Sequence, residues 1–242
     1  MQLIQASSFA ASVDGLILLI TGMVGFWFIL ANIVFFGLIW RFRAKPGVKS
    51  RYITGSEPHL KRWITIPHAL VLVCDVFIIV GAMRVWYNIK QRLPEADATV
   101  RVIGQQWAWV FQYPGTDGTF DTADDFFTTD DLYVENGKTY HFQLQSRDVI
   151  HDFSVPVFRL KQDAIPGTMI PVWFVPTVTT EEMRARKGNP EFGYEISCAQ
   201  LCGLGHYRMK GYMTIHTPEG FQKWMDEQQA ELGGEKQDSV WQ

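Results

Sequence analysis

The sequence predicts a membrane-anchored all-β protein, in which a two-helix transmembrane hairpin (residues 1–93) precedes a Greek-key β-sandwich (94–217) and a C-terminal helix with a polar tail (218–242). Two apolar runs near the N-terminus predict the hairpin. After about Leu93 these runs give way to short segments in which apolar and polar residues alternate, punctuated by Gly, Pro and Asp. Roughly 120 residues of such segments are typical of a sandwich or barrel.

The first apolar run has no ionisable residue from Leu16 to Trp40. A helix of that length, rising about 1.5 Å per residue, exceeds a hydrocarbon core of about 30 Å and therefore predicts a transmembrane helix. The residues before it contain no Lys or Arg, and the run is longer than a signal-peptide core, so we expect this helix to be retained.

The second helix is predicted over about 64–87, although it contains His68 and Asp75. Its apolar part, residues 64–83, is long enough to span a membrane. An unpaired charge in the middle of a bilayer is costly, so Asp75 is either protonated or faces a polar partner in another subunit.

The loop between the two predicted helices is strongly basic. Its single acidic residue is Glu57, whereas its basic residues are Arg41, Arg43, Lys45, Lys49, Arg51, Lys61 and Arg62. By the positive-inside rule, such a loop stays in the cytoplasm. The N-terminus and the chain after Tyr87 are therefore expected outside, which predicts a multi-pass inner-membrane protein with its β domain in the periplasm.

Alternation is clearest where Tyr140, Phe142 and Leu144 are separated by polar residues. This period of two predicts a strand with one buried face. Similar patterns predict strands at 99–103, 169–175, 194–197 and 212–215. The sequence after Pro218 predicts a short amphipathic helix that ends at a Gly-Gly pair, and the chain contains no C-x-x-C-H haem-attachment motif.

The predicted exterior part of the chain is acidic, because residues 88–242 contain 14 Lys and Arg against 22 Asp and Glu. We expect no nucleic-acid partner, and such a surface would instead steer a basic protein. One run without Lys or Arg contains Asp117, Asp121, Asp124, Asp125, Asp130 and Asp131. This run is either a steering surface or only a solvated hairpin, and a calcium loop is less favoured because the D-x-D-x-D-G spacing is absent.

Four potential metal ligands fall within residues 197–211, S-C-A-Q-L-C-G-L-G-H-Y-R-M-K-G, namely Cys198, Cys202, His206 and Met209. Thiolates, an imidazole and a thioether are the ligands that redox copper prefers, whereas structural zinc does not favour the weak Met sulfur. Because the cysteines are four residues apart, both sulfurs could bridge two metal ions, which predicts a dinuclear centre.

Such a centre needs a further imidazole, and His151, at the end of a predicted strand, is the natural candidate. Asp148, Asp152 and Asp163 lie near these ligands in sequence and are the better candidates for docking a basic partner. The competing interpretation is a disulfide between Cys198 and Cys202 in an extracytoplasmic domain, with His206 and Met209 as ordinary loop residues.

The spacing Cys-x3-Cys-x3-His-x2-Met, preceded by D-V-I-H, by K-Q-D-A-I-P-G and by G-Q-Q-W-A-W-V-F-Q-Y at 104–113, resembles the CuA domain of subunit II of haem-copper cytochrome c oxidases. The resemblance covers nearly the whole chain, up to about His216, and implies a cupredoxin fold. It also implies that one copper takes His151 and Met209, that the other takes His206 and the backbone carbonyl of Gln200, and that both share the two thiolates.

Further roles and departures follow from the resemblance. Trp107 corresponds to the exposed indole through which electrons enter from cytochrome c, whereas Trp109 is expected to be structural. Gln200 stands where most relatives have a Glu that helps hold magnesium at the boundary with subunit I, and a neutral amide is a weaker partner for Mg²⁺. Leu60 stands where relatives commonly have a Glu at the mouth of a proton channel, so this proton route is not implied here.

The resemblance implies a non-autonomous subunit of a respiratory oxidase. It would accept electrons from cytochrome c at CuA and pass them to haem in subunit I, where oxygen is reduced to water and protons are translocated. The CuA-bearing subunit of a nitric oxide reductase would share the same motifs. A membrane-anchored copper carrier is an alternative from another class, although a carrier would need neither two transmembrane helices nor the Trp107 motif. A quinol oxidase subunit is disfavoured because such subunits lack the copper ligands.

Overall fold

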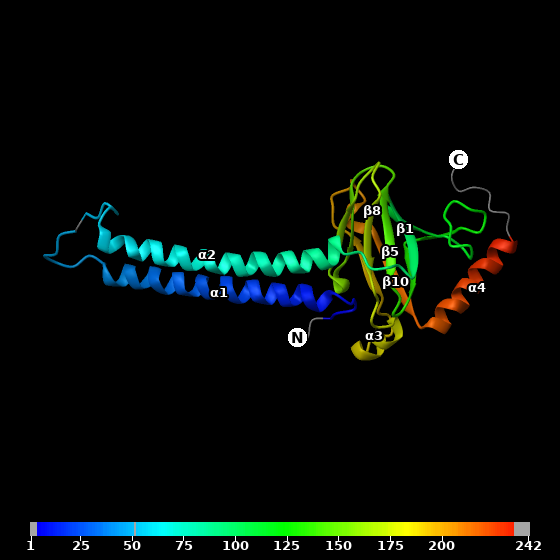
Figure 1. Ribbon diagram of the computed structural model, residues 1–242, viewed down its shortest axis with the longest axis horizontal. Coiled ribbons are helices and arrows are strands. Elements are labelled where there is room, and N and C mark those ends of the chain that lie inside the picture. The colour runs from blue at the N-terminus through cyan, green and yellow to red at the C-terminus, as the bar shows by residue number, and fades with distance from the viewer. Residues whose placement is uncertain (1–3, 51, 235–242) are drawn as a thin grey trace. The chain divides into compact units, whose positions relative to one another are not determined.

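The computed structural model describes residues 4–50 and 52–234 (Figure 1). The chain divides into two compact units, a helical unit at Ser12–Gln91 and a β unit that combines Met1–Ala11 with Arg92–Gln242. Arg51 of the basic loop and the predicted polar tail from residue 235 lie outside the described residues.

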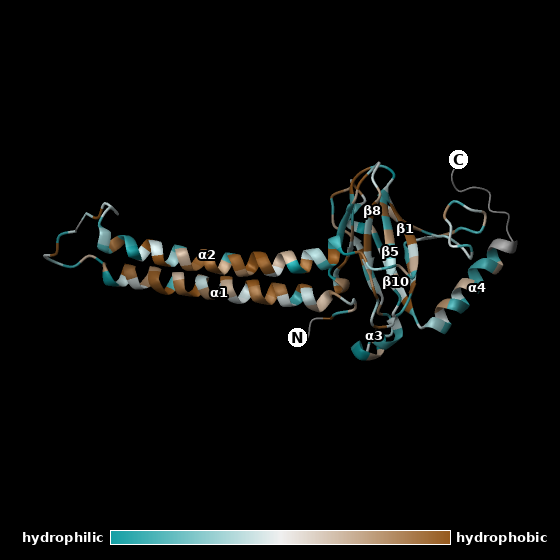
Figure 2. Cartoon of the chain, viewed as in Figure 1, coloured by the Kyte–Doolittle hydropathy of each residue, from teal (hydrophilic) through white to brown (hydrophobic). Residues whose placement is uncertain are grey.

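Two helices, α1 (Ala10–Arg41) and α2 (Pro58–Trp86), form the helical unit, and a π-helical turn at Tyr87–Gln91 follows α2. In the described chain, these two helices are long and apolar enough to cross a membrane (Figure 2). Both extend beyond the apolar runs, because hydropathy marks only the part of a helix that suits the hydrocarbon core.

Side chains of the two helices contact each other around Cys74 and Gly81 of α2. Trp27 Nε1 donates a hydrogen bond to Cys74 Sγ over 3.3 Å. Nearer the C-terminal end of α2, a Cβ atom at Gly81 would lie 3.3 Å from a methyl group of Leu16. The absence of a side chain at Gly81 therefore allows the two helices to pack closely. Because α1 and α2 meet in this antiparallel way, they form the predicted hairpin.

The β unit contains two five-stranded sheets within the described residues. The first sheet has the order β3 (Phe126–Thr129), β2 (Ala108–Tyr113), β1 (Ala98–Gln105), β5 (Tyr140–Ser146) and β8 (Ile170–Phe174). The second has the order β4 (Asp131–Glu135), β10 (Lys210–His216), β9 (Tyr194–Cys198), β6 (His151–Val155) and β7 (Leu160–Ala164). The pairs β1–β5 and β4–β10 are parallel, and the other pairs are antiparallel.

The five strands that alternation predicts are all present, as β1, β5, β8, β9 and β10. On β5, the apolar residues Tyr140, Phe142 and Leu144 are buried, as their period of two predicts. Phe142 stacks on Phe174 of β8, with ring centroids 4.6 Å apart. Phe142 also packs against Phe153 of β6, with ring centroids 6.3 Å apart, so aromatic side chains from both sheets meet in the core.

The N-terminal segment belongs to the β unit. The Ala6 amide donates to the Val157 carbonyl over 3.1 Å, and the Ala6 carbonyl accepts from the Thr177 amide over 3.0 Å. Phe9 packs edge-on against Trp173, with ring centroids 5.5 Å apart. The chain therefore begins in the β unit, forms the hairpin and returns to the β unit at Arg92.

Two further helices belong to the β unit. Helix α3 (Thr180–Lys187) begins at a capping box formed by Thr179 and Glu182. Helix α4 (Pro218–Gly234) occurs where the sequence predicts it, and Trp224 on this helix stacks on Tyr133 with ring centroids 4.5 Å apart. The described helix ends at Gly234, so it stops at the predicted Gly-Gly pair and includes both glycines.

Candidate metal centre

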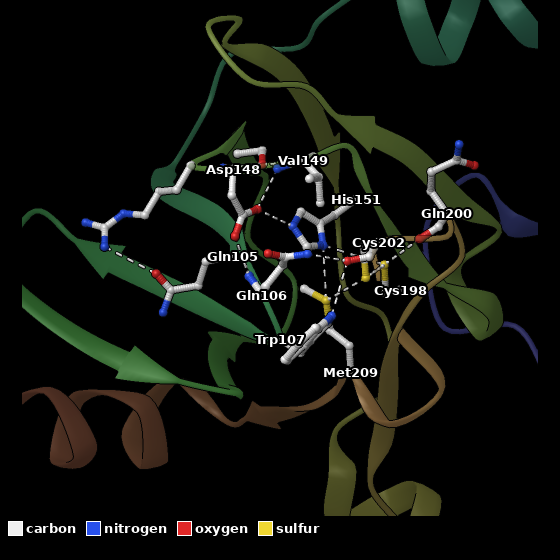
Figure 3. Close-up of polar contacts among 12 residues, drawn as sticks. Gln105, Gln106, Trp107, Asp148, Val149, His151, Cys198, Gln200, Cys202 and Met209 are labelled. Atoms are coloured by element: carbon white, nitrogen blue, oxygen red, sulfur yellow. Dashed lines mark hydrogen bonds and ion pairs between the residues drawn. The ribbon is translucent and has the colours of Figure 1, made fainter. Parts of the chain in front are cut away.

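The predicted ligands converge at one end of the second sheet, and Figure 3 labels all of them except His206. His151 is the first residue of β6 and so lies at the end of a strand, as predicted, and Cys198 is the last residue of β9. The loop from Cys198 to Met209 returns on itself, since the Cys198 amide donates to the Met209 carbonyl over 3.2 Å. The Ala199 amide donates to the Asp152 carbonyl over 3.1 Å, which ties this loop to β6.

Two cysteine sulfurs form the middle of the cluster. Cys198 Sγ and Cys202 Sγ are 3.7 Å apart, and both cysteines are free, so the structure contains no disulfide between them. Met209 Sδ lies 3.7 Å from Cys202 Sγ and 3.1 Å from His151 Nδ1. His151 Nδ1 in turn lies 3.8 Å from Cys198 Sγ, which places one imidazole and the thioether beside the sulfur pair.

A second imidazole and a backbone carbonyl complete the cluster. His206, in the short 3-10 helix η3 (His206–Arg208), places Nδ1 3.6 Å from Cys202 Sγ. The carbonyl oxygen of Gln200 lies 3.2 Å from Cys198 Sγ, while the exposed Gln200 side chain points away from the sulfurs (Figure 3). The structure thus brings together every ligand that the sequence predicts.

Asp148 orients one of the two imidazoles. Its Oδ1 lies 2.8 Å from His151 Nε2, and its carboxylate also accepts from the Gln106 and Val149 amides over 2.7 Å each. Partial burial raises the pKa of Asp148, but the hydrogen bond from His151 and those amides together lower it. An ionised Asp148 therefore holds the proton of His151 on Nε2, which leaves Nδ1 free to face the sulfurs.

The two thiols differ in acidity. Burial alone would raise the pKa of Cys198, but hydrogen bonds with His151 and with the backbone at Asp152 and Gln200 lower it to about 6. Burial and the neighbouring Cys198 sulfur raise the pKa of Cys202 to about 12. Binding of a metal ion between the sulfurs would therefore release a proton from Cys202, because metals bind thiolates.

Trp107 lies against the loop from Cys198 to Met209, which we call the ligand loop. Its indole Nε1 donates to the Cys202 carbonyl over 3.2 Å, and the same carbonyl accepts from Gln106 Nε2 over 2.8 Å. A Cβ atom at Gly205 would overlap the Trp107 ring at Cδ2, so only glycine allows this close contact. The indole is half-buried, so one part of it reaches the surface while its Nε1 contacts the ligand loop.

Trp109 has a different environment, as the sequence predicts. Its side chain is fully buried and packs edge-on against His151 and Phe153, with ring centroids 6.0 Å and 5.3 Å away. It is a packing residue behind the ligand.

Large apolar side chains surround the candidate centre on the surface. Leu204 is 91% exposed and Tyr207 is 80% exposed, and both belong to the ligand loop. Leu201 and Ile150, next to ligands in sequence, are also exposed. Such a patch around a functional site is typical of a surface that meets another protein.

One docking candidate, Asp152, is wrong. Asp152 is only 4% exposed, and burial together with its hydrogen bond to Asp163 raises its pKa to about 6. A residue that cannot reach the surface cannot dock a partner. Asp163 is only half-buried, so its docking role stays a prediction. Asp148 remains exposed, but it also orients His151, a role that its sequence position alone did not indicate.

The acidic run mostly supports its own loop. Asp121 forms an ion pair with Arg101 over 2.9 Å, and buried Asp125 accepts from the Gln112 side chain. Asp124 accepts from Thr116 and Thr122 over 2.7 Å each. These contacts favour the solvated-hairpin interpretation over a dedicated steering surface.

The chain is similar to known subunits of cytochrome c oxidases. Residues 98–215 match the family described as cytochrome c oxidase subunit II, periplasmic domain. Similar proteins include cytochrome c oxidase subunit 2 of Cereibacter sphaeroides, 27% identical over 88% of this chain and 74% of the relative. Another is the alternative cytochrome c oxidase subunit 2 of Bradyrhizobium diazoefficiens, 29% identical over 87% of this chain and 79% of the relative.

A third relative is more similar over a shorter part. Cytochrome c oxidase subunit 2 of Thermostichus vulcanus is 40% identical, over 55% of this chain and 34% of the relative. Among solved structures, the periplasmic domain of subunit II of cytochrome oxidase from Bradyrhizobium japonicum is 27% identical, with a TM-score of 0.47 over 58% of this chain and 99% of that domain.

Proposed function

Because the chain belongs to the cytochrome c oxidase subunit II family, we propose that it is the subunit through which electrons enter a haem-copper oxidase. It accepts them from cytochrome c at a dinuclear CuA centre and passes them to haem in subunit I. Oxygen reduction and proton translocation take place in that partner, so this chain is a non-autonomous part of the enzyme.

The convergence of six donor groups carries this proposal. Two thiols, two imidazoles, a thioether and a carbonyl, all within 3.8 Å of a neighbouring donor, make a set that fits two copper ions and suits neither Mg²⁺ nor a single structural zinc. When bound, the copper pair would supply a one-electron redox centre whose charge is shared across both sulfurs.

The residues divide into two ligand pairs around the shared cysteines. His151 and Met209, whose donor atoms are 3.1 Å apart, would hold one ion. His206 and the Gln200 carbonyl would hold the other, and Cys198 and Cys202 would bridge both. These ligands are anchored on paired strands and by backbone hydrogen bonds, so they would move little when the centre changes charge. Small movement favours fast electron transfer.

Trp107 is the residue through which we expect electrons to reach this loop. Its indole is joined by a hydrogen bond to the carbonyl of a copper ligand, Cys202. Exposed Leu204 and Tyr207 offer an apolar docking surface on the same loop, and Asp148 adds an acidic group beside it. Cytochrome c, a basic partner with an apolar haem edge, would suit this surface.

Membrane insertion completes the proposal. The two apolar helices would anchor the chain in the inner membrane, with the basic loop in the cytoplasm and the β unit in the periplasm. Subunit I and other oxidase subunits would be its partners there. Magnesium at the subunit boundary has less support, because Gln200 supplies no charge and its side chain points away from the sulfurs.

Substrate consumption by the purified complex tests the function. With reduced cytochrome c as the donor, the complex should consume oxygen, and this chain alone should consume none. Consumption of nitric oxide in place of oxygen would support the nitric oxide reductase alternative. Copper that leaves the isolated chain faster than one turnover of the complex would support the carrier.

Removal of the Asp148 carboxylate should weaken copper binding. In Asp148→Ala, His151 loses the partner that fixes its Nε2 proton, so copper affinity should fall roughly 10–100-fold in a chelator competition titration. Asp121→Ala makes the same charge change at a side chain that is 72% exposed and should leave the affinity unchanged. Equal affinities in both variants would show that Asp148 does not position His151.

Met209→Leu should keep both copper ions but change the reduction potential and slow electron transfer. The thioether is the weakest ligand of the set, so its loss changes the electronics more than the occupancy. Met213→Leu replaces a buried methionine of β10 outside the cluster and is the matched control. A redox titration with copper analysis checks both variants, and complete loss of copper from Met209→Leu would contradict the weak-ligand assignment.

A further inference from the structure

The apolar stretch of α2 contains one acidic residue, Asp75. Asp75 lies inside the 64–83 run, about 12 Å from one end and about 17 Å from the other at 1.5 Å per residue. Its side chain is exposed, and within the described part of the chain its carboxylate has no hydrogen-bond or ion-pair partner. The bilayer interior provides no water to replace one, so the group needs a partner from outside this chain.

Asp75 belongs to a polar face of α2, which we call the Asp75 face. Its members recur at alternating spacings of four and three residues, and they are Lys61, Thr65, His68, Leu72, Asp75 and Ile79. This spacing keeps side chains on one side of a helix. Between Arg62 and Arg84, the polar residues other than Cys74 are Thr65, His68 and Asp75, and all three lie on this face.

A different face of α2 meets α1. The contacts with Trp27 and Leu16 come from Cys74 and Gly81, which are seven residues apart and so lie on one line along the helix. At about 100° per residue, the Asp75 face is turned by roughly 110° or more from that line. In the described hairpin, α1 therefore leaves the Asp75 face uncovered.

We propose that the Asp75 face is buried against a membrane-spanning helix of another oxidase subunit, which places a cation or an N–H or O–H donor opposite Asp75. Lipid chains offer no such group. A second copy of α2 would bring two Asp75 carboxylates together, and their like charges disfavour that contact. The inference rests on the proposed function only in assuming a multi-subunit membrane complex.

Site-specific photocrosslinking in the assembled complex tests the proposal. A benzophenone amino acid is placed singly at Leu72 or Ile79 on the Asp75 face, in the full chain within its native membrane. Val73 and Val80 are matched controls, because they are also apolar and exposed but lie on the opposite flank of α2. We expect heterologous adducts from Leu72 and Ile79, at several times the yield from Val73 and Val80.

Two substitutions sharpen the test. Asp75→Asn keeps an acceptor oxygen and should preserve the Leu72 adduct, whereas Asp75→Leu should reduce its yield several-fold. Equal yields from both flanks, adducts only with lipid, an adduct with a second copy of this chain, or no effect of Asp75→Leu would each overturn the proposal. Copper content is measured on the same samples. Two copper ions per chain without the heterologous adduct would overturn the interface proposal and leave the proposed function standing.

Discussion

Replacement of Cys198 by serine should abolish the two-copper centre. Cys198 Sγ lies within 3.8 Å of Cys202, His151 and the Gln200 carbonyl, so its loss removes one of the two sulfurs shared by both proposed ligand pairs. The loss of copper affinity should exceed the roughly 10–100-fold that removal of a ligand's hydrogen-bond partner costs. Oxidation of cytochrome c by the complex should fall with it.

Cys74→Ser is the matched control, because Cys74 is also a free cysteine but lies on α2 beside Trp27. This variant should keep both copper ions and full turnover. Copper analysis and oxygen uptake are measured on both variants in the assembled complex. Two copper ions per chain in Cys198→Ser would contradict the bridging role.

Trp107→Gln should slow electron uptake from cytochrome c about tenfold or more, equivalent to ~1.4 kcal/mol in the barrier. A glutamine keeps an N–H donor in place of the indole N–H, but the substitution removes the aromatic ring between the surface and the loop. Because no proposed ligand changes, the copper content and the copper spectrum should stay as in the unaltered protein. Stopped-flow mixing with reduced cytochrome c measures the rate.

Trp109→Phe separates this role from packing. Trp109 is buried against His151 and Phe153, so its shortening should lower the free energy of unfolding by about 1–2 kcal/mol and affect electron uptake less. Unchanged electron uptake in Trp107→Gln would exclude Trp107 from the pathway.

The sequence predicted those features that repeat or cluster locally. The alternation at Tyr140, Phe142 and Leu144 indicates a half-buried strand without knowledge of its neighbours, and β5 confirms it. Cys198, Cys202, His206 and Met209 lie in one loop, so their spacing in the sequence predicts that they form one cluster. His151 is distant in sequence, and it was identified by its residue type and by the family resemblance rather than by any local pattern.

The remaining features depend on contacts between distant residues. Asp148 looks like any surface aspartate until β6 places His151 Nε2 2.8 Å from its carboxylate. Asp152 is buried because it follows His151 into β6, and its neighbours on β7 and β9 are visible only in the folded sheet. The N-terminal segment has no periodicity, and its place in the β unit rests on backbone hydrogen bonds such as Ala6 to Val157.

Copper content measured together with the low-temperature electron paramagnetic resonance spectrum tests the central claim most directly. The full chain is the appropriate sample, because its N-terminal segment forms part of the β unit. We expect two copper ions per chain and one unpaired electron shared equally between them. One copper ion with a single-ion spectrum, or none with Cys198 and Cys202 oxidised to a disulfide, would contradict a dinuclear electron-accepting centre.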